Sequence, residues 1–532
     1  MAIRSGRCTK FGECSLADNK MQQSVPEGSD ILCQECGGRL VLSSDSKSSN
    51  GIILLLVIIL ALGGIVFGAI KIFSSKKSTV SQPVAVSTII ATTTIPAPQS
   101  APPPKVEQKE EIILRLHGSE TIGGNMAIEL ADAFLAKEGG TNIQKVLTDD
   151  PKQRYIKASF GDKIKVIEIK FYGSSTAFTD ILEQKADIGM ASRRVKEKEI
   201  AELKNAGIGD MVSPECEYVI AMDAVAVLVN RVNPVKSLTK AQLLDIFSGK
   251  ITDWEQVKGT QGKIKLYARD KKAGAYEIFA SSIMKDVPFA ASTEIIPDSS
   301  VLSDKVAGDP MAIGFAGLPF VRSARALEIA DTGAISRLPT PFNIAREDYL
   351  LSRRLYLYTQ QLPKNPFTLK FIDFTLSKQG QEIVQKSGFV DLTIIPEKKE
   401  VVQKVVKKGF KDRYEEITAN ALQLSTNFRF ETGKDILDTK ATRDLDRISE
   451  TMNEPENRNK SFYLLGFADN RGKEQTNILL SRSRALTVSE ELKKRGLIGK
   501  IVEGFGSKRP VASNDNEEGR EKNRRVEIWI DN

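Results

Sequence analysis

Residues 464–496 read LLGFADNRGKEQTNILLSRSRALTVSEELKKRG, and this stretch decides the fold of the C-terminal part of the chain. Its apolar start belongs to a short strand predicted over 462–467, and the polar residues 469–472 predict a turn. Residues 477–494 then predict an amphipathic helix, whose apolar face carries Ala485, Val488 and Leu492. Further along, 524–530 predicts a closing strand with alternating apolar side chains at Val526, Ile528 and Ile530. The region therefore alternates strand and helix.

The same region, assigned here to residues 425–532, resembles the C-terminal domain of the OmpA family. The family pattern is Gly-x-x-Asp-x-x-Gly, then Asn-x-x-Leu-Ser-x-x-Arg-Ala, then Gly-Arg-x-x-Asn-Arg-Arg-Val. The chain meets this pattern at Gly466, Asp469, Gly472, Asn477, Leu480, Ser481, Arg484, Ala485, Gly519, Arg520, Asn523, Arg524, Arg525 and Val526. The resemblance implies an α+β domain that binds peptidoglycan through the diaminopimelate of its stem peptides.

Diaminopimelate presents an ammonium and a carboxylate on one carbon, so its recognition needs an anionic and a cationic side chain close together. The residues that match the family's binding positions are Asp469, Asn477 and Arg484. A plainer alternative is that Asp469 caps the turn and that Arg484 forms a surface ion pair. Ala468 stands where many relatives have threonine, which removes one hydroxyl from the turn.

Residues 111–397 alternate short apolar runs, such as IILRL and KVIEIKFY, with amphipathic segments, such as NMAIELADAFLAKEGG. This alternation is typical of an α/β fold with parallel strands. Two turns between a strand and a helix are rich in hydroxyls: LHGSETIGGNM carries Ser119 and Thr121, and YGSSTAF carries Ser174 and Ser175. Helix N-termini offer free N–H groups and the positive end of the helix dipole, so both turns suit an oxyanion.

This middle region resembles the phosphate-binding proteins, the periplasmic substrate-binding subunits of phosphate import systems. The likeness is carried by ADIGMASR, NPVKSLTKAQLLDIFSGKITDWEQV, IKLYARD, AIGFAGLPFV, RRLYLY and FIDFTLSKQGQEIVQKSGFV. The resemblance implies two α/β lobes joined by crossing strands, with an oxyanion held in the cleft by N–H groups, hydroxyls and an arginine. The matching positions are Ser119, Thr121, Ser174, Ser175, Ser192, Arg193, Arg269 and Gly274.

The chain departs from the phosphate-binding family at one binding loop. Relatives carry a Ser-Gly-Thr group after the Arg-Asp of IKLYARD, whereas this chain has Ala273, Gly274 and Ala275. Each hydrogen bond lost to a charged ligand costs roughly 1.5 to 3 kcal/mol unless another donor replaces it. Arg193 also stands where some relatives have aspartate, which makes the pocket more positive. The alternative is a domain that keeps the fold but binds another small ligand or a protein partner.

Residues 48–70 contain no charged side chain and consist mainly of Ile, Leu, Val, Gly and Ala. A helix of about 20 apolar residues spans a bilayer, so this stretch predicts one transmembrane helix, at 48–73. A cysteine-bearing segment precedes it, unlike a cleavable signal peptide, and Lys71 and Lys76 can reach the polar interface at its end. A buried core helix is the alternative.

Four of the five cysteines precede this apolar stretch, in the patterns CTKFGEC and CQECGGRL. Four thiolates can bind Zn²⁺ tetrahedrally, and the glycines after the last of them permit the tight turn of a zinc-ribbon knuckle. Residues 1–46 are therefore expected to form a small zinc ribbon whose structural Zn²⁺ is bound by Cys8, Cys14, Cys33 and Cys36. Two disulfides, or one disulfide and free thiols, are the alternatives. Cys216 is expected to be a buried apolar side chain.

Two connectors complete the organisation of the chain. Residues 74–110 are rich in Ser, Thr and Pro and cannot build a core, and 398–424 is a charged linker. The charges beside the apolar stretch do not decide its orientation. A reduced zinc ribbon belongs in the cytoplasm and a wall-binding domain outside it. We therefore expect a single-pass protein of the bacterial inner membrane, with its N-terminus cytoplasmic and most of the chain periplasmic.

Composition narrows the function. The chain has 532 residues, of which 41% are hydrophobic and 27% charged, as in globular proteins of several domains. Its net charge of +8 is spread along the sequence, which argues against nucleic-acid binding. A single histidine, His117, argues against a catalytic triad or a multi-histidine metal centre, so we expect a binding protein and no enzyme.

The main hypothesis is an envelope protein that binds phosphate or a similar oxyanion, for import or sensing, while it holds peptidoglycan. An ABC permease is a candidate partner for import. The competing hypothesis is a structural tether of the envelope whose middle domain has lost anion binding and recognises proteins.

Overall fold

The computed structural model describes residues 3–8, 22–26, 32–33, 40–42, 109–271, 273–397, 412–430 and 436–532. The chain divides into two compact units, Met1–Glu107 and Gln108–Asn532, which are described separately. The predicted transmembrane helix at 48–73 lies outside the described residues, as does the spacer up to residue 108. Within the described ranges, no helix combines the length and apolar character needed to cross a membrane.

Three short strands form an antiparallel sheet in the N-terminal unit: β1 (Ile3–Cys8), β2 (Gln22–Pro26) and β3 (Leu40–Leu42), in the order β2-β1-β3. Cys8 ends β1 and pairs in register with Leu40 of β3. Cys33 is buried, whereas Cys14 and Cys36 lie outside the described residues. The sheet thus places Cys8 beside the strand that follows Cys33 and Cys36 in the chain.

One 11-stranded sheet runs through the middle domain, in the order β12-β11-β13-β9-β16-β8-β4-β7-β6-β5, with β14 paired to β9. Its strands are β4 (Lys109–Gly118), β5 (Thr141–Leu147), β6 (Gln153–Phe160), β7 (Lys163–Lys170), β8 (Ile188–Ala191), β9 (Glu217–Val229), β11 (Lys265–Arg269), β12 (Glu294–Ile296), β13 (Ala312–Gly317), β14 (Arg325–Ala326) and β16 (Ser352–Tyr358). The predicted parallel pairing holds for β4 with β7 and β8, and for β11 with β12 and β13. The strands that cross between the lobes pair antiparallel.

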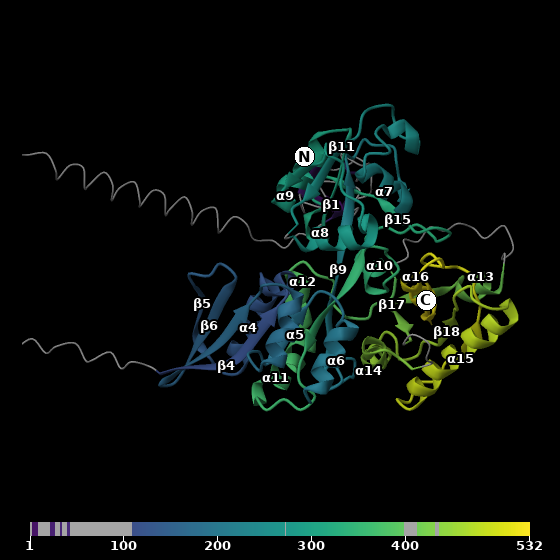
Figure 1. Cartoon of the computed structure of the whole chain (residues 1–532). Helices are drawn as coiled ribbons and strands as arrows, with labels where there is room; N and C mark the ends of the chain where they lie inside the picture. The colour runs from purple at the N-terminus through teal and green to yellow at the C-terminus, as the bar shows by residue number, and fades with distance from the viewer. Residues whose placement is uncertain are drawn as a thin grey trace, which may run out of the picture. The chain divides into compact units, whose positions relative to one another are not determined.

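The crossing strands β9 and β16 join two lobes, as the family resemblance predicted. Residues 217–224 of β9 pair with β16, and residues 225–229 pair with β13 of the other lobe. Figure 1 shows β9 passing from the part of the sheet that carries β4 to the part that carries β11. The lobe built around β4 is called lobe 1 here, and the lobe built around β11 is called lobe 2.

Helices cover the sheet in both lobes. Lobe 1 has α3 (Glu120–Gly123), α4 (Met126–Lys137), α5 (Ser174–Leu182), α6 (Glu197–Asn205), α11 (Pro366–Leu376) and α12 (Lys378–Lys386). Lobe 2 has α7 (Lys240–Phe247), α8 (Gly274–Phe279), α9 (Ser299–Gly308), α10 (Pro341–Ala345), the 3₁₀ turns Trp254–Val257 and Leu318–Phe320, the π-helix η2 (Ala280–Met284), and the two-stranded sheet of β10 (Ser237–Thr239) and β15 (Glu328–Ala330).

Buried aromatic side chains hold the helices to the sheet. In lobe 1, Phe134 of α4 packs edge-on against Phe371 of α11, with ring centroids 5.3 Å apart. In lobe 2, Phe279 of α8 stacks on Phe315 of β13 at 4.1 Å. Burial of such side chains supplies a large apolar area to each core. Each lobe is therefore fixed by its own packing.

The C-terminal domain has a four-stranded sheet with helices packed on it. Its strands are β17 (Ala421–Arg429), β18 (Phe462–Gly466), β19 (Ile501–Gly504) and β20 (Arg525–Asp531), in the order β17-β20-β18-β19. Its helices are α13 (Arg413–Thr418), α14 (Thr439–Asn453), α15 (Glu474–Lys493) and α16 (Glu517–Asn523). The strand, helix and closing strand predicted from the sequence are all present.

The linker predicted at 398–424 is shorter in the structure. Residues 398–411 lie outside the described ranges, but α13 and the start of β17 fall within the predicted linker. The backbone N–H of Ile395 donates to the Ser425 hydroxyl at 2.9 Å, and Pro396 forms a β-bridge with Leu424. The end of the middle domain therefore runs beside β17.

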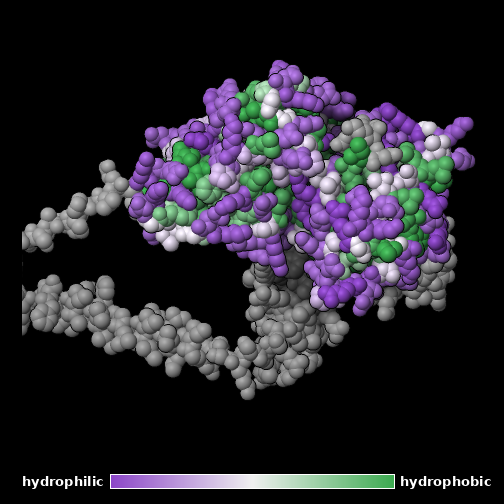
Figure 2. All heavy atoms as spheres, turned by 90° about the horizontal axis from the view of Figure 1, so that it is seen from below, coloured by the Kyte–Doolittle hydropathy of each residue, from purple (hydrophilic) through white to green (hydrophobic). Residues whose placement is uncertain are grey.

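The surface of the described residues is largely hydrophilic on the face seen in Figure 2, with hydrophobic residues scattered between polar ones. Scattered apolar residues are normal on domains that face water.

Candidate binding sites

The loop after β4 is held against the end of β8 by backbone contact. The Ser119 N–H donates to the Met190 carbonyl at 2.7 Å. Gly118 has a φ of +141°, and a Cβ there would lie 2.0 Å from the same carbonyl oxygen. Only glycine fits this close approach. The buried Ser119 therefore has a fixed place at the carboxyl end of β4.

The turn before α5 joins this loop. The Gly173 N–H donates to the Gly118 carbonyl at 2.8 Å. The hydroxyl of Ser174 accepts a hydrogen bond from the Ser192 N–H at 3.0 Å and lies 3.1 Å from the Ser192 hydroxyl. Carboxyl ends of neighbouring parallel strands meet at one edge of a sheet, where ligands of open α/β folds bind. The structure thus brings Ser119, Ser174 and Ser192 together at this edge.

Arg193 lies beside these hydroxyls, but a carboxylate balances its charge. Its two terminal nitrogens donate to Glu199 at 2.8 and 2.7 Å, and one of them also donates to the Ser175 hydroxyl at 3.2 Å. Burial raises the pKa of Glu199, yet the Arg193 hydrogen bonds outweigh it and lower that pKa overall. The expected extra positive charge of Arg193 is therefore largely neutralised by its own neighbour.

Arg353, on β16, is the arginine that touches both lobes. Its guanidinium donates to the Thr121 hydroxyl of lobe 1 at 3.0 Å and to the Glu277 carboxylate of lobe 2 at 3.1 Å. Its Nε donates to Asp223 on β9 at 3.1 Å. Sequence reasoning missed this residue, although it belongs to the RRLYLY phrase that supported the family resemblance. The signal that would have found it is the pair of adjacent arginines, Arg353 and Arg354, that begins this phrase.

Gly274 brings lobe 2 close to Thr121. A Cβ on Gly274 would lie 2.6 Å from the Thr121 hydroxyl oxygen and 2.8 Å from an Arg353 nitrogen. Glycine at the start of α8 therefore permits the close approach of the two lobes. The cleft is closed at this point, and Thr121, Gly274 and Arg353 meet there.

Asp223 is a carboxyl group at the same place, with 11% of its side chain exposed. Burial raises its pKa, while the adjacent Arg353 opposes that shift. A carboxyl group beside the meeting point can accept a hydrogen bond from a protonated oxyanion. It was a second residue that sequence reasoning missed.

Arg269 is placed differently from the other predicted residues. Its guanidinium donates to the Pro297 carbonyl at 2.7 Å and to the Ser299 hydroxyl, and both partners belong to lobe 2. Burial lowers its pKa. In this structure, Arg353 rather than Arg269 is the arginine that contacts Thr121.

His117, the residue before Gly118, is buried between two carboxylates. Its Nδ1 lies 2.7 Å from Asp180, and its Nε2 lies 3.1 Å from Glu168. Burial raises the pKa of Glu168, but hydrogen bonds from His117 and Lys170 lower it overall, to about 2. The histidine therefore ties β4 to β7 and α5 directly below the serine loop, a structural role.

The predicted peptidoglycan site lies at the turn after β18. Asp469 accepts a hydrogen bond from Arg524 at 2.9 Å and from the Arg471 N–H at 2.9 Å. The Asn477 amide donates to the Asp469 carbonyl at 3.1 Å, which fixes the turn to α15. Asp469 forms an ion pair with Arg524 in this structure, a partner that the sequence did not predict.

Arg484 lies on α15 and is buried. Its guanidinium stands over the ring of Phe430, 5.5 Å from the centroid. A planar guanidinium over an aromatic face retains donors in its plane for a carboxylate. Arg524 belongs to the Asn-Arg-Arg-Val part of the sequence pattern, and it was not among the predicted binding residues.

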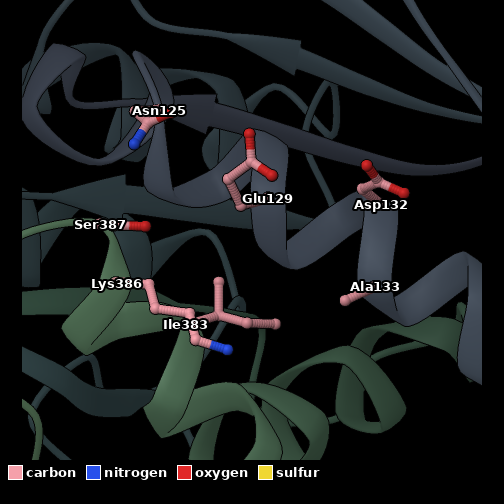
Figure 3. Close-up of a pocket in the computed structure, with 7 residues that line it drawn as sticks. All are labelled: Asn125, Glu129, Asp132, Ala133, Ile383, Lys386 and Ser387. Atoms are coloured by element: carbon pink, nitrogen blue, oxygen red, sulfur yellow. The ribbon is translucent and has the colours of Figure 1, made fainter. Parts of the chain in front are cut away.

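A pocket of about 480 Å³ lies between α4 and α12. Figure 3 shows Glu129 and Asp132 on α4 facing Ile383 and Lys386 on α12. Both carboxylates already pair with Lys145, at 2.8 and 3.0 Å. Its lining shares no residue with the predicted anion site.

Two family models match the chain. The model for the PBP superfamily domain matches residues 138–379, and the model for the OmpA family matches residues 429–524.

Several known proteins are similar to the middle domain. The phosphate-binding protein PstS of Staphylococcus saprophyticus is 31% identical over 229 residues, which are 41% of this chain and 69% of that protein. The phosphate-binding protein PstS of Borreliella burgdorferi is 24% identical over 291 residues, which are 53% of this chain and 99% of that protein. The crystal structure of an ABC-type phosphate transport receptor from Vibrio cholerae is 24% identical, with a TM-score of 0.41, over 52% of this chain and 99% of that one.

Proposed function

Through its two-lobed domain the chain belongs to the family of phosphate-binding proteins called PstS, and we propose that its cleft binds phosphate or a closely related oxyanion. The observation that carries the proposal is the meeting of Thr121, Gly274 and Arg353 between the lobes. Arg353 sits on a crossing strand, so an anion bound to its guanidinium contacts both lobes at once. A charged donor of this kind gives strong hydrogen bonds to oxyanions.

The other donors come from the neighbouring strand ends. The predicted residues Ser119, Thr121, Ser174, Ser175, Ser192, Arg193, Arg269 and Gly274 remain the proposed lining, to which Arg353 and Asp223 are added. Relatives carry hydroxyl donors at the positions of Ala273 and Ala275, and the guanidinium N–H groups of Arg353 would replace those donors. Asp223 would favour an oxyanion that still carries a proton, because two unprotonated anions repel each other.

The test is equilibrium dialysis of the full chain against radiolabelled inorganic phosphate. Arg353→Gln should weaken binding by at least about tenfold, because it removes a charged hydrogen bond worth roughly 1.5 to 3 kcal/mol. Arg322→Gln is the matched control, since Arg322 forms an exposed pair with Asp304 in lobe 2. Retained phosphate binding in Arg353→Gln would argue against the proposed site.

The closed cleft supports a second candidate function. Gly274 and Thr121 leave no room for an added Cβ between the lobes, and two hydroxyls of the family are replaced by Ala273 and Ala275. A structural tether whose middle domain recognises proteins fits these features. Absence of phosphate binding in the unmodified chain would favour the tether.

We propose further that the C-terminal domain, a member of the OmpA family by its sequence pattern, binds peptidoglycan through diaminopimelate. Asp469 would bind the ligand ammonium, and Arg484 would bind the ligand carboxylate. Asn477 would fix the turn that carries Asp469. Arg524 pairs with Asp469 in this structure, so the Asp469 carboxylate would bind both Arg524 and the ligand ammonium.

Sedimentation with isolated sacculi tests the wall site. Asp469→Ala and Arg484→Ala should each lose most of the bound fraction, because each removes one charge of the recognised pair. Asp446→Ala, at a pair with Arg495 outside the site, is the control. Unchanged sedimentation of both site variants would refute the assignment.

The same proposal places the protein in the bacterial envelope. The helix predicted at 48–73 would anchor the chain in the inner membrane, with an ABC permease as a candidate partner for import.

A structural Zn²⁺ bound by Cys8, Cys14, Cys33 and Cys36 would stabilise the N-terminal sheet. The pairing of Cys8 with Leu40 supports this, because it places the backbone of Cys8 beside a strand that follows Cys33 and Cys36 closely in the sequence. Metal analysis of the full chain and of Cys36→Ser would test the zinc site.

A further inference from the structure

The C-terminal domain is attached to lobe 1 through its helix α14. Thr439 donates a hydrogen bond to the buried carboxylate of Glu217 at 2.5 Å, and Arg443 donates to the Glu217 carbonyl at 2.8 Å. The Arg443 guanidinium also stands over the ring of Tyr218, 4.3 Å from its centroid. Hydrogen bonds to a charged acceptor are about twice as strong as those between neutral groups. The helix therefore has a firm attachment at the start of β9.

The chain that connects the two domains adds a second attachment to lobe 1. Residues 390–397 leave lobe 1 beside α12, where the Leu392 N–H donates to the Gln381 side chain at 2.7 Å. The same segment then runs beside β17, and the Glu397 N–H donates to the Gln423 carbonyl at 2.7 Å. Because lobe 1 holds the C-terminal domain in both ways, a hinge motion between the lobes carries this domain with lobe 1.

Asp331 of lobe 2 makes a separate contact with the C-terminal domain. Its side chain is buried, and one carboxylate oxygen accepts a hydrogen bond from the Ser513 N–H at 2.9 Å. Other contacts of this domain with lobe 2 involve residues 346–350, which directly precede the crossing strand β16. Asp331 instead follows β15, which lies outside the sheet that the two lobes share. Opening of the lobes would therefore separate Asp331 from Ser513.

Ser513 belongs to a loop that reaches the turn of the proposed wall site. The side chain of the next residue, Asn514, accepts a hydrogen bond from the Asn470 N–H at 3.2 Å. Asn470 directly follows Asp469 in the chain. One side of the loop thus binds Asp331 of lobe 2, and the other side contacts the turn that carries Asp469.

We propose that the hydrogen bond between Asp331 and Ser513, called the latch here, holds the cleft closed and couples anion release to ligand binding at the wall site. The inference rests on the proposed phosphate and wall sites. An opening of the lobes must break the latch, so the intact latch opposes release of the anion. A stem peptide bound at Asp469 orders the neighbouring loop and lowers the entropy cost of forming the latch. By linkage, an anion in the cleft tightens binding of the stem peptide.

Stopped-flow measurement of phosphate release from the full chain tests the latch. Asp331→Asn turns one carboxylate oxygen into an NH₂ group, so one oxygen is left for the two N–H donors of Thr332 and Ser513. Release should become at least about fivefold faster, because a hydrogen bond to a charged acceptor is lost. Asp309→Asn, at a pair with Lys265 within lobe 2, is the matched control and should release phosphate at the unmodified rate.

The distance between the lobes gives a readout that does not depend on phosphate. Spin labels would be attached through introduced non-canonical amino acids at Leu147 of lobe 1 and Val232 of lobe 2, both exposed. Leu147 lies on β5, the edge strand of the sheet in lobe 1, so a hinge motion displaces it. Without phosphate, Asp331→Asn should broaden the distance distribution, and Asp309→Asn should not. Unchanged distances in Asp331→Asn would overturn the latch.

A soluble tripeptide that ends in diaminopimelate tests the coupling to the wall site. It should slow phosphate release from the unmodified chain by at least about threefold, because its binding favours the latched state. It should not slow release from Asp331→Asn, which lacks the latch. A tripeptide that binds the chain by calorimetry but leaves release unchanged would overturn the coupling.

The outcomes separate the latch from the proposed function. An unmodified chain that binds no phosphate would refute the cleft site, and one that binds no tripeptide would refute the wall site. In both cases the distance measurement still decides whether the latch holds the lobes. Unchanged release from Asp331→Asn, in a chain that binds phosphate, would overturn the control of release by the latch.

Discussion

At the scale of single residues, the direction in which a side chain points matters for binding as much as the residue type does. The sequence contains Arg269 in the phrase that resembles the family, and this arginine was predicted to hold the anion. The structure turns its guanidinium to Pro297 and Ser299, and it gives Arg353 the contact with Thr121. Residue type and spacing predict which strand carries a side chain. They do not predict which neighbour the side chain binds, because that depends on packing between segments distant in the sequence.

Gly118 gives a residue-scale prediction. Gly118→Ala should lower the free energy of unfolding by more than about 2 kcal/mol, because the new Cβ would collide with the Met190 carbonyl at a φ that disfavours side chains. It should also weaken phosphate binding by displacing the Ser119 loop. Denaturant unfolding and dialysis measure the two effects.

Gly308→Ala is the control for this change, since nothing lies within 4 Å of its Cβ position. Equal stability of the Gly118→Ala variant and the unmodified chain would contradict the geometry of the loop.

At the scale of elements, apolar periodicity predicted the C-terminal domain closely. The helix predicted at 477–494 is α15, Glu474–Lys493, and the strand predicted at 462–467 is β18, Phe462–Gly466. The start of α15 was missed because Lys473 caps it without a side-chain hydrogen bond, so no Ser, Thr, Asp or Asn marks the position. The start of β17 was missed because a charged segment precedes it and the sequence pattern assigned both to a linker.

The hydrogen bonds of His117 with Glu168 and Asp180, which join β4 to β7 and α5, give a pH-dependent prediction. The pKa of Glu168 is about 2 in the folded chain, below its ordinary value of 4.5, so its contribution to stability is complete above pH 4.5. That contribution is lost as the pH falls toward 2. Glu168→Gln should therefore show a smaller loss of stability than the unmodified chain between pH 5 and pH 3.

Thermal unfolding at several pH values measures this difference, which is about 2 kcal/mol between pH 5 and pH 3. Glu202→Gln, at an exposed pair with Lys198, is the control. A Glu168→Gln variant with an unchanged pH dependence would show that the carboxylate does not hold the three elements as described.

At the scale of the whole molecule, the sequence predicted separate middle and C-terminal domains but not their shared buried charges. Asp348 of the middle domain pairs with Arg346 at 3.1 Å and accepts a hydrogen bond from Asn427 of β17 at 2.9 Å. Thr439 of α14 donates to the buried Glu217 at 2.5 Å. No single segment of sequence encodes the contacts of Asp348 with Asn427 and of Glu217 with Thr439, because their partners lie in different domains.

Asp348→Ala should therefore destabilise both domains together. It leaves Arg346 and Arg429 without a shared buried carboxylate, a loss that typically costs 3 to 5 kcal/mol. Hydrogen exchange should quicken in both β9 and β17. Asp304→Ala, at the exposed pair with Arg322, should change neither strand, and faster exchange in β17 alone would contradict the shared interface.

The central claim is that an oxyanion binds between the lobes at Arg353. Titration calorimetry of the full chain with inorganic phosphate, comparing Arg353→Gln with the control Arg322→Gln, tests it most directly. Arg353→Lys serves as the variant that keeps the charge and should bind at intermediate strength. We predict that Arg353→Gln loses phosphate binding while Arg322→Gln retains it. Retained phosphate binding in Arg353→Gln would contradict the claim.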